Sequence, residues 1–368
     1  MTQRLPPALT PLDTALAALL RGVDPIATIE LPLAEAAGCI AAGTPLLAAC
    51  PSCDIAAADG WALCANDIVG ASAYSPLPLT TAPVWVDAGD AMPPGCDCVL
   101  DADAVEVSGP LAQVLAEGVP GRGVRRAGSD IAGRAPAVAE GHLIHPAALL
   151  LARTAGVEKL SVRRPRLGIV NVPGAAVTAH MIAEIARAAG LQVQAREAAA
   201  RDAASIAEAL GDLACDLVVT VGGSGAGRRD AAVSALARHG DVLAHGLALQ
   251  PGRTAAVGRL GPVPIVALPG SPDHALGAWL ALVLPLVDRL SARQLRRRMT
   301  LPLARKIASS VGIAEIALLA EEHHAWLPLA VGEWPLQAIA RADAWLLVPA
   351  SHEGFAAGTP VDAYLMRE

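Results

Sequence analysis

A glycine-rich stretch near the middle of the chain holds the residue types best suited to chemistry. Residues 215–232 read CDLVVTVGGSGAGRRDAA, so four glycines, two arginines and Asp230 follow a run of β-branched residues. This pattern predicts a buried strand, a tight turn and the start of a helix. Such a turn presents backbone N–H groups at the carboxyl edge of a sheet, where negative charge is favoured. The sequence therefore predicts a phosphate site here, with a purely structural glycine turn as the alternative.

Two familiar phosphate-binding motifs nearly match this loop, and both fail. Gly222 and Gly227 have the P-loop spacing, but Arg228 and Arg229 stand where the lysine and the Mg²⁺-binding hydroxyl residue belong. The dinucleotide fingerprint lacks its third glycine and the acidic residue about twenty positions further on. A nucleotide triphosphatase is therefore not expected.

Strands and helices alternate around the loop and must position it. Apolar strands are expected at 167–172, 191–193, 217–221 and 263–268, and helices at 177–189, at 203–213 and after the turn 269–272. This alternation indicates a mostly parallel sheet with helices on both faces. The apolar segment 276–290 is interpreted as a buried helix, because Pro285 and Asp288 interrupt it short of the ~20 residues of a membrane span.

The flanking regions favour short strands. Between Thr44 and Val124, and again after the basic stretch 293–298, short apolar runs are separated by proline and glycine. Thr10 is expected to cap a helix that runs to Arg21, with Pro11 at its first position. We expect a linker and helical-β domain (1–43 and 125–163), an inserted β-rich module (44–124), an α/β domain (164–292) and a C-terminal β module (293–368).

Composition narrows the classes of function. The formal charge of −7 over 368 residues argues against a nucleic-acid partner. Neither a signal peptide nor a membrane segment is expected, and the odd number of seven cysteines suggests reduced thiols in the cytoplasm. Cys50 and Cys53 have a CxxC spacing, but Cys96 and Cys98 are too close together to complete a zinc knuckle.

Carboxylates are dense in the β-rich module. They could serve a hard metal ion, but aspartates beside glycine are also common turn residues, and the sequence favours turns. The residues in question are Asp54, Asp59, Asp67, Asp87, Asp90, Asp97, Asp101 and Asp103.

Several stretches, in the same order along the chain, resemble the molybdopterin molybdenumtransferase family, which includes the E domain of gephyrin. Each motif alone is weak, but together they extend over residues 10–365 and are specific. The matching stretches are PLAEAAG (32–38), AADGWA (57–62), Gly89 to Asp97, Arg125 to Gly133, Asp216 to Asp230, Pro251-Gly252-Arg253 and Leu268 to Pro272.

The resemblance implies an elongated, multidomain homodimer with a central α/β molybdopterin-binding domain. It implies insertion of molybdate into adenylylated molybdopterin with release of AMP, assisted by Mg²⁺. The catalytic carboxylates would be Asp59, Asp130 and Asp230, with Asp59 and Asp230 at the metal. The residues implied to bind the pterin ligand are Gly222, Gly223, Ser224, Gly225, Gly227, Arg228, Arg229, Gln250, Arg253, Pro269, Gly270, Ser271 and Pro272.

The chain also departs from the family pattern. Relatives carry a T-G-D-E-L loop after the first strand of the α/β domain, whereas here residues 170–175, VNVPGA, run almost directly into the helix. Ala88 replaces a family threonine and Gln250 replaces a lysine. Losing these groups should weaken metal and molybdate handling more than pterin binding. Two hypotheses follow, a transferase or a non-catalytic molybdopterin carrier for a client molybdoenzyme; a scaffold without ligand is a third.

Overall fold

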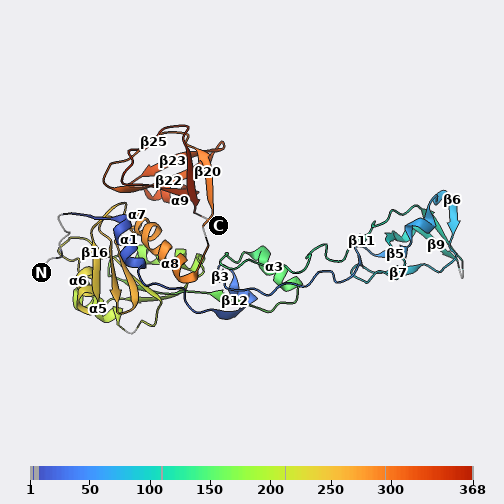
Figure 1. Cartoon of the computed structure of the whole chain (residues 1–368), viewed down its shortest axis with the longest axis horizontal. Coiled ribbons are helices and arrows are strands. Elements are labelled where there is room, and N and C mark those ends of the chain that lie inside the picture. Colours follow the sequence, from blue (N-terminus) through green and yellow to red (C-terminus); the bar gives the residue numbers. More distant parts are fainter. Residues whose placement is uncertain (1–2, 4–7, 109–110, 212, 295, 367–368) are drawn as a thin grey trace. The chain divides into compact units, whose positions relative to one another are not determined.

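The computed structural model of the protein describes residue 3 and residues 8–108, 111–211, 213–294 and 296–366. The chain forms two compact units, which are described separately (Figure 1). The larger unit comprises residues 1–42, 140–144 and 161–368, and the smaller unit comprises residues 43–139 and 145–160. The four domains expected from the sequence remain a prediction, because each unit contains parts of more than one of them.

A six-stranded sheet organises the larger unit. Its strands are β13 (Arg166–Asn171), β14 (Gln192–Glu197), β15 (Leu217–Val221), β16 (Asp241–His245), β18 (Ala256–Leu260) and β19 (Val263–Leu268). They lie in the order β14-β13-β15-β19-β18-β16. The first four run parallel to one another, and β18 pairs antiparallel with both β19 and β16. Every residue of β15 is buried, as expected for a central parallel strand covered on both faces. The mostly parallel sheet expected from the sequence is confirmed.

Helices cover both faces of this sheet. One face packs against α1 (Leu12–Leu20), α4 (Ala176–Ala188), α7 (Pro272–Ala278), the π-helical turn η3 (Trp279–Val283) and α8 (Leu284–Ser291). The other face packs against α5 (Ala203–Leu210) and α6 (Ala232–His239). The helical stretch Pro272–Ser291 is long and apolar enough to cross a membrane, but 78% of its most apolar window is buried inside the structure. It is therefore a core helix of this unit.

A second sheet carries the C-terminal residues. It contains β1 (Thr10–Pro11), β17 (Leu247–Gln250), β22 (Ala314–Glu322), β24 (Ala344–Val348), β26 (Pro360–Leu365) and β20 (Arg298–Pro302) in that order, with β23 (Ala325–Val331) paired to β22. Leu319, Trp326 and Val348 belong to its core. The strand pair β21 (Ile307–Ala308) and β25 (Gly354–Phe355) and the helix α9 (Leu336–Arg341) complete this region.

The start of the first helix differs from the expectation. Thr10 and Pro11 form β1, in which Thr10 pairs with Leu247 of β17 and its N–H donates to the Gly246 carbonyl at 2.9 Å. The helix α1 begins at Leu12 and has no side-chain cap. The prediction of a threonine cap was wrong, because a local pattern does not reveal a hydrogen bond to a strand more than two hundred residues away.

The smaller unit is built from short strands, as its proline and glycine rhythm predicted. Its elements include one helix, α3 (Pro146–Thr154). One three-stranded sheet has the order β7 (Val84–Val86), β5 (Gly60–Leu63), β8 (Cys98–Leu100), and another the order β6 (Ser72–Pro78), β10 (Leu111–Ala116), β9 (Val105–Ser108). The pair β4 (Ile55–Ala56) and β11 (Val124–Arg125) and the 3₁₀ turns η1 (Ala65–Ile68) and η2 (Ala102–Ala104) are also present.

A few short elements remain. The helix α2 (Leu33–Ala36) is shorter than the expected segment 33–39, and the strands β2 (Ile29–Pro32), β12 (Lys159–Arg163) and β3 (Ile40–Ala41) form a small sheet. All seven cysteines are free thiols. Among them, burial is the largest cause raising the pKa of Cys98, to about 11.

Leu217 tests the importance of the central strand. Its side chain is fully buried in the core between β15 and the helices. We expect Leu217→Ala to lower the free energy of unfolding of this unit by about 2–5 kcal/mol, because it removes buried methyl groups and leaves a cavity. Urea denaturation measures the change. Leu336→Ala is the matched control, since Leu336 is 63% exposed, and an equal loss in both variants would contradict the assignment of the core.

Candidate functional site

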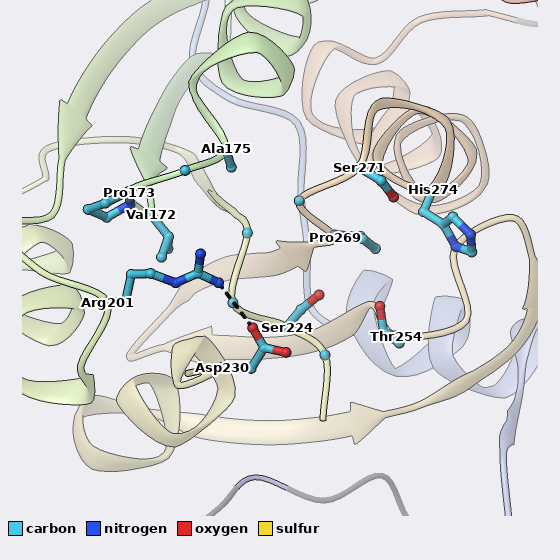
Figure 2. Close-up of a pocket in the computed structure, with 15 residues that line it drawn as sticks. Val172, Pro173, Ala175, Arg201, Ser224, Asp230, Thr254, Pro269, Ser271 and His274 are labelled. Carbon is cyan, nitrogen blue, oxygen red and sulfur yellow. Dashed lines mark hydrogen bonds and ion pairs between the residues drawn. The ribbon is translucent and has the colours of Figure 1, made fainter. Parts of the chain in front are cut away.

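A cavity of about 340 Å³ lies where the parallel strands end. Its walls are the loops that follow β13, β15 and β19, namely residues 172–175, 222–225 and 269–271, together with Arg201, Asp230, Thr254 and His274 (Figure 2). The chain leaves β13 for α4 on one face of the sheet and leaves β15 for α6 on the other face, so the loops diverge between these two neighbouring strands. Ligands of open α/β sheets bind in the crevice that such a divergence leaves at the carboxyl ends of the strands.

The glycine loop follows a path that side chains would not permit. Gly222 and Gly223 have φ of 94° and 71°, in the left-handed region that favours glycine. The Gly222 N–H donates to the Leu268 carbonyl at 3.0 Å, which ties the loop to the end of β19. A Cβ on Gly222 would lie 3.0 Å from the Cβ of Ala175. The loops after β13, β15 and β19 are therefore held close together at the floor of the cavity.

Asp230 closes the glycine loop from the other end. Its Oδ2 accepts a hydrogen bond from the Gly227 N–H at 2.8 Å, and its Oδ1 lies 3.5 Å from a guanidinium nitrogen of Arg201. A Cβ on Gly225 would approach Oδ2 to 2.6 Å. A side chain at position 225 is therefore disfavoured by the nearby carboxylate and not by a positive φ. Asp230 both holds the loop in place and lines the cavity.

Arg201 is the basic side chain of the cavity, and the sequence reasoning missed it. It follows β14, and Figure 2 shows its guanidinium directed towards Asp230 across the hollow. The next residue, Asp202, caps α5 by accepting hydrogen bonds from the N–H groups of Ala204 and Ser205. The sequence shows only that Arg201 lies between a strand and the capping aspartate, whereas its approach to Asp230 depends on the order of the strands.

The cap at Asp202 depends on its charge. The hydrogen bond from the Ser205 N–H is the largest cause that holds the pKa of Asp202 below its ordinary value. Because folding lowers the pKa of Asp202, its cap stabilises the folded state at pH values above the pKa that Asp202 has in the unfolded chain. This stabilisation is lost as the pH falls through the pKa of Asp202 in the folded state. We therefore expect the capped start of α5, and with it the backbone position of the neighbouring Arg201, to be stable at neutral pH.

Two polar groups in or near the cavity could receive a ligand. The hydroxyl of Ser224 and the Nε of Arg201 are buried and have no hydrogen-bond partner within the described chain. Buried polar groups are normally paired, so such atoms need an explanation. Ser224 lines the cavity and its residue is only 1% exposed. An oxygen-rich anion would satisfy both groups.

The structure brings eight of the predicted site residues together at this cavity. They are Gly222, Gly223, Ser224, Gly225, Asp230, Pro269, Gly270 and Ser271. The others predicted in this unit do not line it: Gly227, Arg228, Arg229, Gln250, Arg253 and Pro272. Arg228, Arg229 and Arg253 are exposed, and Gln250 lines a separate cavity beside Glu315.

The other two predicted catalytic carboxylates belong to the smaller unit. Asp59 accepts a hydrogen bond from the Ala88 N–H at 2.8 Å, and Asp130 lies 3.2 Å from Arg125. Because Asp59 belongs to one compact unit and Asp230 to the other, their convergence remains a prediction.

The cavity does not by itself fit a divalent cation. Its single carboxylate, Asp230, already bonds to the Gly227 N–H and faces Arg201. Among the residues that the structure describes, no cluster of three or more histidine, cysteine or acidic side chains could hold a metal ion. The backbone N–H groups of the cavity and the guanidinium of Arg201 suit an anion better than a cation.

Gly225 gives a direct test of the loop. Gly225→Val would force the backbone away from Asp230, so we expect at least a tenfold loss of affinity for pyrophosphate, measured by calorimetry. Gly261→Val is the control, because a Cβ on Gly261 meets no neighbour, although its φ of 58° makes any side chain there strained. Unchanged affinity in a folded Gly225→Val protein would mean that the anion lies elsewhere.

Arg201 gives a second test. Arg201→Gln removes the positive charge but keeps a polar side chain, and charge-assisted hydrogen bonds to an anion contribute about 1.5–3 kcal/mol. We expect pyrophosphate affinity to fall about 10- to 100-fold in the same titration. Arg187→Gln, on the exposed side of α4, should leave the affinity unchanged. Equal effects of both changes would indicate only a general loss of charge.

Comparison with known proteins agrees with this architecture. Residues 10–156 match the model of the MoeA N-terminal region (domain I and II), and residues 154–289 match that of a probable molybdopterin binding domain. Molybdopterin molybdenumtransferase 2 of Mycobacterium tuberculosis is 31% identical over 315 residues, covering 73% of this chain and 76% of the relative. The enzyme of Synechococcus elongatus named molybdopterin molybdenumtransferase is 26% identical over 383 residues, covering 92% and 94%.

A solved structure has the same fold. The molybdopterin biosynthesis moeA protein from Pyrococcus horikoshii OT3 superposes with a TM-score of 0.72 at 22% identity, over 97% of this chain and all of the other. The fold, the matched domains and the relative at 31% identity together show that this chain belongs to the molybdopterin molybdenumtransferase family.

Proposed function

We propose that this protein inserts molybdate into adenylylated molybdopterin and releases AMP. Its family places it in molybdenum cofactor biosynthesis, and its relatives carry the name of an enzyme, molybdopterin molybdenumtransferase. The non-catalytic carrier considered from the sequence is less well supported, because the curated relatives at 31% and 26% identity are both named as transferases.

The observation that carries the proposal is the anion-binding cavity at the ends of the parallel strands. The substrate of this reaction is anionic, since a phosphoric anhydride joins the phosphate of the pterin to AMP. Backbone N–H groups of the loop 223–225 and the guanidinium of Arg201 are the kinds of groups that recognise phosphate oxygens. The Ser224 hydroxyl, buried without a partner in the described chain, could supply one more hydrogen bond.

In this proposal the chain's residues bind and orient the anhydride. Arg201 pairs with a phosphate oxygen and thereby gives up its 3.5 Å contact with Asp230. A water oxygen bonds to the phosphorus of the pterin phosphate as the bond to the bridging oxygen breaks and AMP leaves. Negative charge then grows on the phosphate of AMP, and a fixed guanidinium stabilises that charge. Molybdate is the second substrate. As its molybdenum bonds to the two dithiolene sulfurs of the pterin, one of its oxygens leaves as water with the two thiol protons.

The short loop after β13 leaves few acidic groups. Pro173, Gly174 and Ala175 line the cavity where relatives carry the acidic loop, and Gly174 turns with a φ of 96°. A Cβ on Gly174 would lie 3.1 Å from Arg201, so the compact loop makes room for that side chain. Assistance by Mg²⁺ stays a prediction, and no step of the mechanism is assigned to it.

Three further features remain predictions of the proposal. Asp59 of the smaller unit would complete the site opposite Asp230, with Asp130 near it. A homodimer would form, with the site shared between subunits as the resemblance implies, and a client molybdoenzyme would accept the product. A location in the cytoplasm would suit such a biosynthetic enzyme.

The test is release of AMP from adenylylated molybdopterin with molybdate, in the presence and absence of Mg²⁺. We expect multiple turnovers that fall at least tenfold in Asp59→Ala and in Asp230→Ala, because even ~1.4 kcal/mol of lost transition-state stabilisation gives that factor. Asp24→Ala is the control, since Asp24 is exposed on a loop outside the cavity. Tight pterin binding without turnover would reject the transferase and establish a carrier.

A further inference from the structure

Two tryptophans of the smaller unit stand apart from the others. Aromatic residues make up only 2% of the chain, with six tryptophans. Trp279, Trp326, Trp334 and Trp345 are buried, with exposures of 0–6%. Trp85 is 43% exposed, and its neighbour Trp61 is only partly buried. Folding does not require an indole at the surface, so this pair calls for another explanation.

The two indoles are set side by side by strand pairing. Trp61 of β5 lies directly opposite Trp85 of β7 in an antiparallel ladder. Their rings are 5.2 Å apart and nearly perpendicular, at 86°. Edge-to-face packing of this kind stabilises both rings. It holds Trp85 in place while a large part of its surface stays accessible.

Carboxylates flank the pair at the same end of the ladder. Because Gly60 pairs with Val86, Asp59 and Asp87 lie just beyond that pair, and alternation places them on the same side as the indoles. The Trp85 Nε1–H donates to the Oδ1 of Asp87 at 2.8 Å, and the Ala88 N–H donates to the Oδ1 of Asp59 at 2.8 Å. Each of these two hydrogen bonds uses one oxygen of its carboxylate.

The turn that carries these groups is itself fixed. The Asp87 N–H donates to the Oδ2 of Asp90 at 3.0 Å, and the Asp90 N–H donates to the Asp87 carbonyl at 2.9 Å. The Gly89 N–H donates to the Ala56 carbonyl at 2.9 Å. The aromatic and acidic side chains are therefore preorganised rather than carried on a loose loop, which lowers the cost of binding a ligand.

We propose that this surface, formed by Asp59, Trp61, Trp85 and Asp87, binds the heteroaromatic ring of the substrate. The inference rests on the proposed function, whose substrate carries two such rings, adenine and pterin. An indole face stacks on any planar heterocycle, while carboxylates accept hydrogen bonds from amino and ring N–H groups. The negative charge of Asp59 and Asp87 disfavours phosphate groups, so this surface suits a ring rather than the anhydride.

Between the two rings the carboxylates favour the pterin. A pterin presents an amino group beside a ring N–H, and two adjacent donors match the two oxygens of a carboxylate. Adenine presents only its amino group on that edge. The structure thus assigns Trp85 a stacking role shared by both rings and Asp87 a role that distinguishes them.

The test is calorimetric titration of the intact protein with 6-hydroxymethylpterin and, separately, with adenosine, both of which lack phosphate. We expect the pterin to bind, and Trp85→Ala to weaken it about 5- to 100-fold, the loss expected for one stacked ring. Trp85→Phe should recover most of the affinity. Leu111→Ala, which removes another exposed apolar side chain of this unit, is the matched control and should have no effect.

Asp87→Asn separates the two rings, because it should weaken the pterin at least tenfold and leave adenosine unchanged. Adenosine binding that is lost in Trp85→Ala while the pterin never binds would overturn the assignment to pterin. Equal affinity of wild type and Trp85→Ala for both rings would overturn the proposal as a whole. So would a change of molecular mass in Trp85→Ala by light scattering with affinity intact, since the tryptophans would then be an interface between copies.

These titrations do not depend on turnover. A wild-type protein that binds the pterin through Trp85 but releases no AMP would refute the proposed transferase and leave the ring site standing. Active turnover that is equally fast, with an equal KM, in wild type and Trp85→Ala would refute the ring site and leave the transferase standing.

Discussion

The close approach of three loops at the ends of β13, β15 and β19 is the constraint on which the candidate site depends. Gly222 and Gly223 adopt positive φ, and a side chain on Gly222 would collide with Ala175. The buried core beneath these loops therefore positions them, in addition to stabilising the fold. Every buried residue of β15 helps to fix where the loop N–H groups lie, and those groups favour an anion.

The pair of Arg201 and Asp230 gives this site its electrostatic character. Their separation of 3.5 Å, with both side chains partly exposed, makes a weak contact that a phosphate could displace. Asp230 has a second bond to the Gly227 N–H, so it keeps a role in holding the loop when Arg201 turns to a ligand. The short loop 172–175 after β13 contains no acidic residue, in keeping with a cavity whose main basic group is an arginine.

Much of the fold could be predicted from the sequence, because it depends on local periodicity. The buried run 217–221 and the glycines after it predicted a strand that is followed by a turn at the carboxyl end of a parallel sheet. The structure confirmed both. Thr10 was misjudged because its decisive contact, with Leu247, is remote in sequence. Arg201 was missed for a related reason: it enters the cavity from the loop after β14, and only the strand order brings that loop beside Asp230.

The exposure of individual side chains was harder to predict than the path of the backbone. Arg228 and Arg229 looked suited to a phosphate because they follow the glycines, yet they are exposed and do not line the cavity. The pairing of Trp61 with Trp85 needed the register of β5 against β7, which no single segment specifies. The spacing of the glycines therefore identified the loop 222–225, whereas the three-dimensional arrangement decides which side chains line the cavity.

The most direct test of the central claim is a crystal structure of the protein soaked with adenylylated molybdopterin. We expect a phosphate group within hydrogen-bonding distance of the N–H groups of residues 223–225 and of the Arg201 guanidinium, with Arg201 turned away from Asp230. A phosphate bound elsewhere, with the pair of Arg201 and Asp230 unchanged, would contradict it.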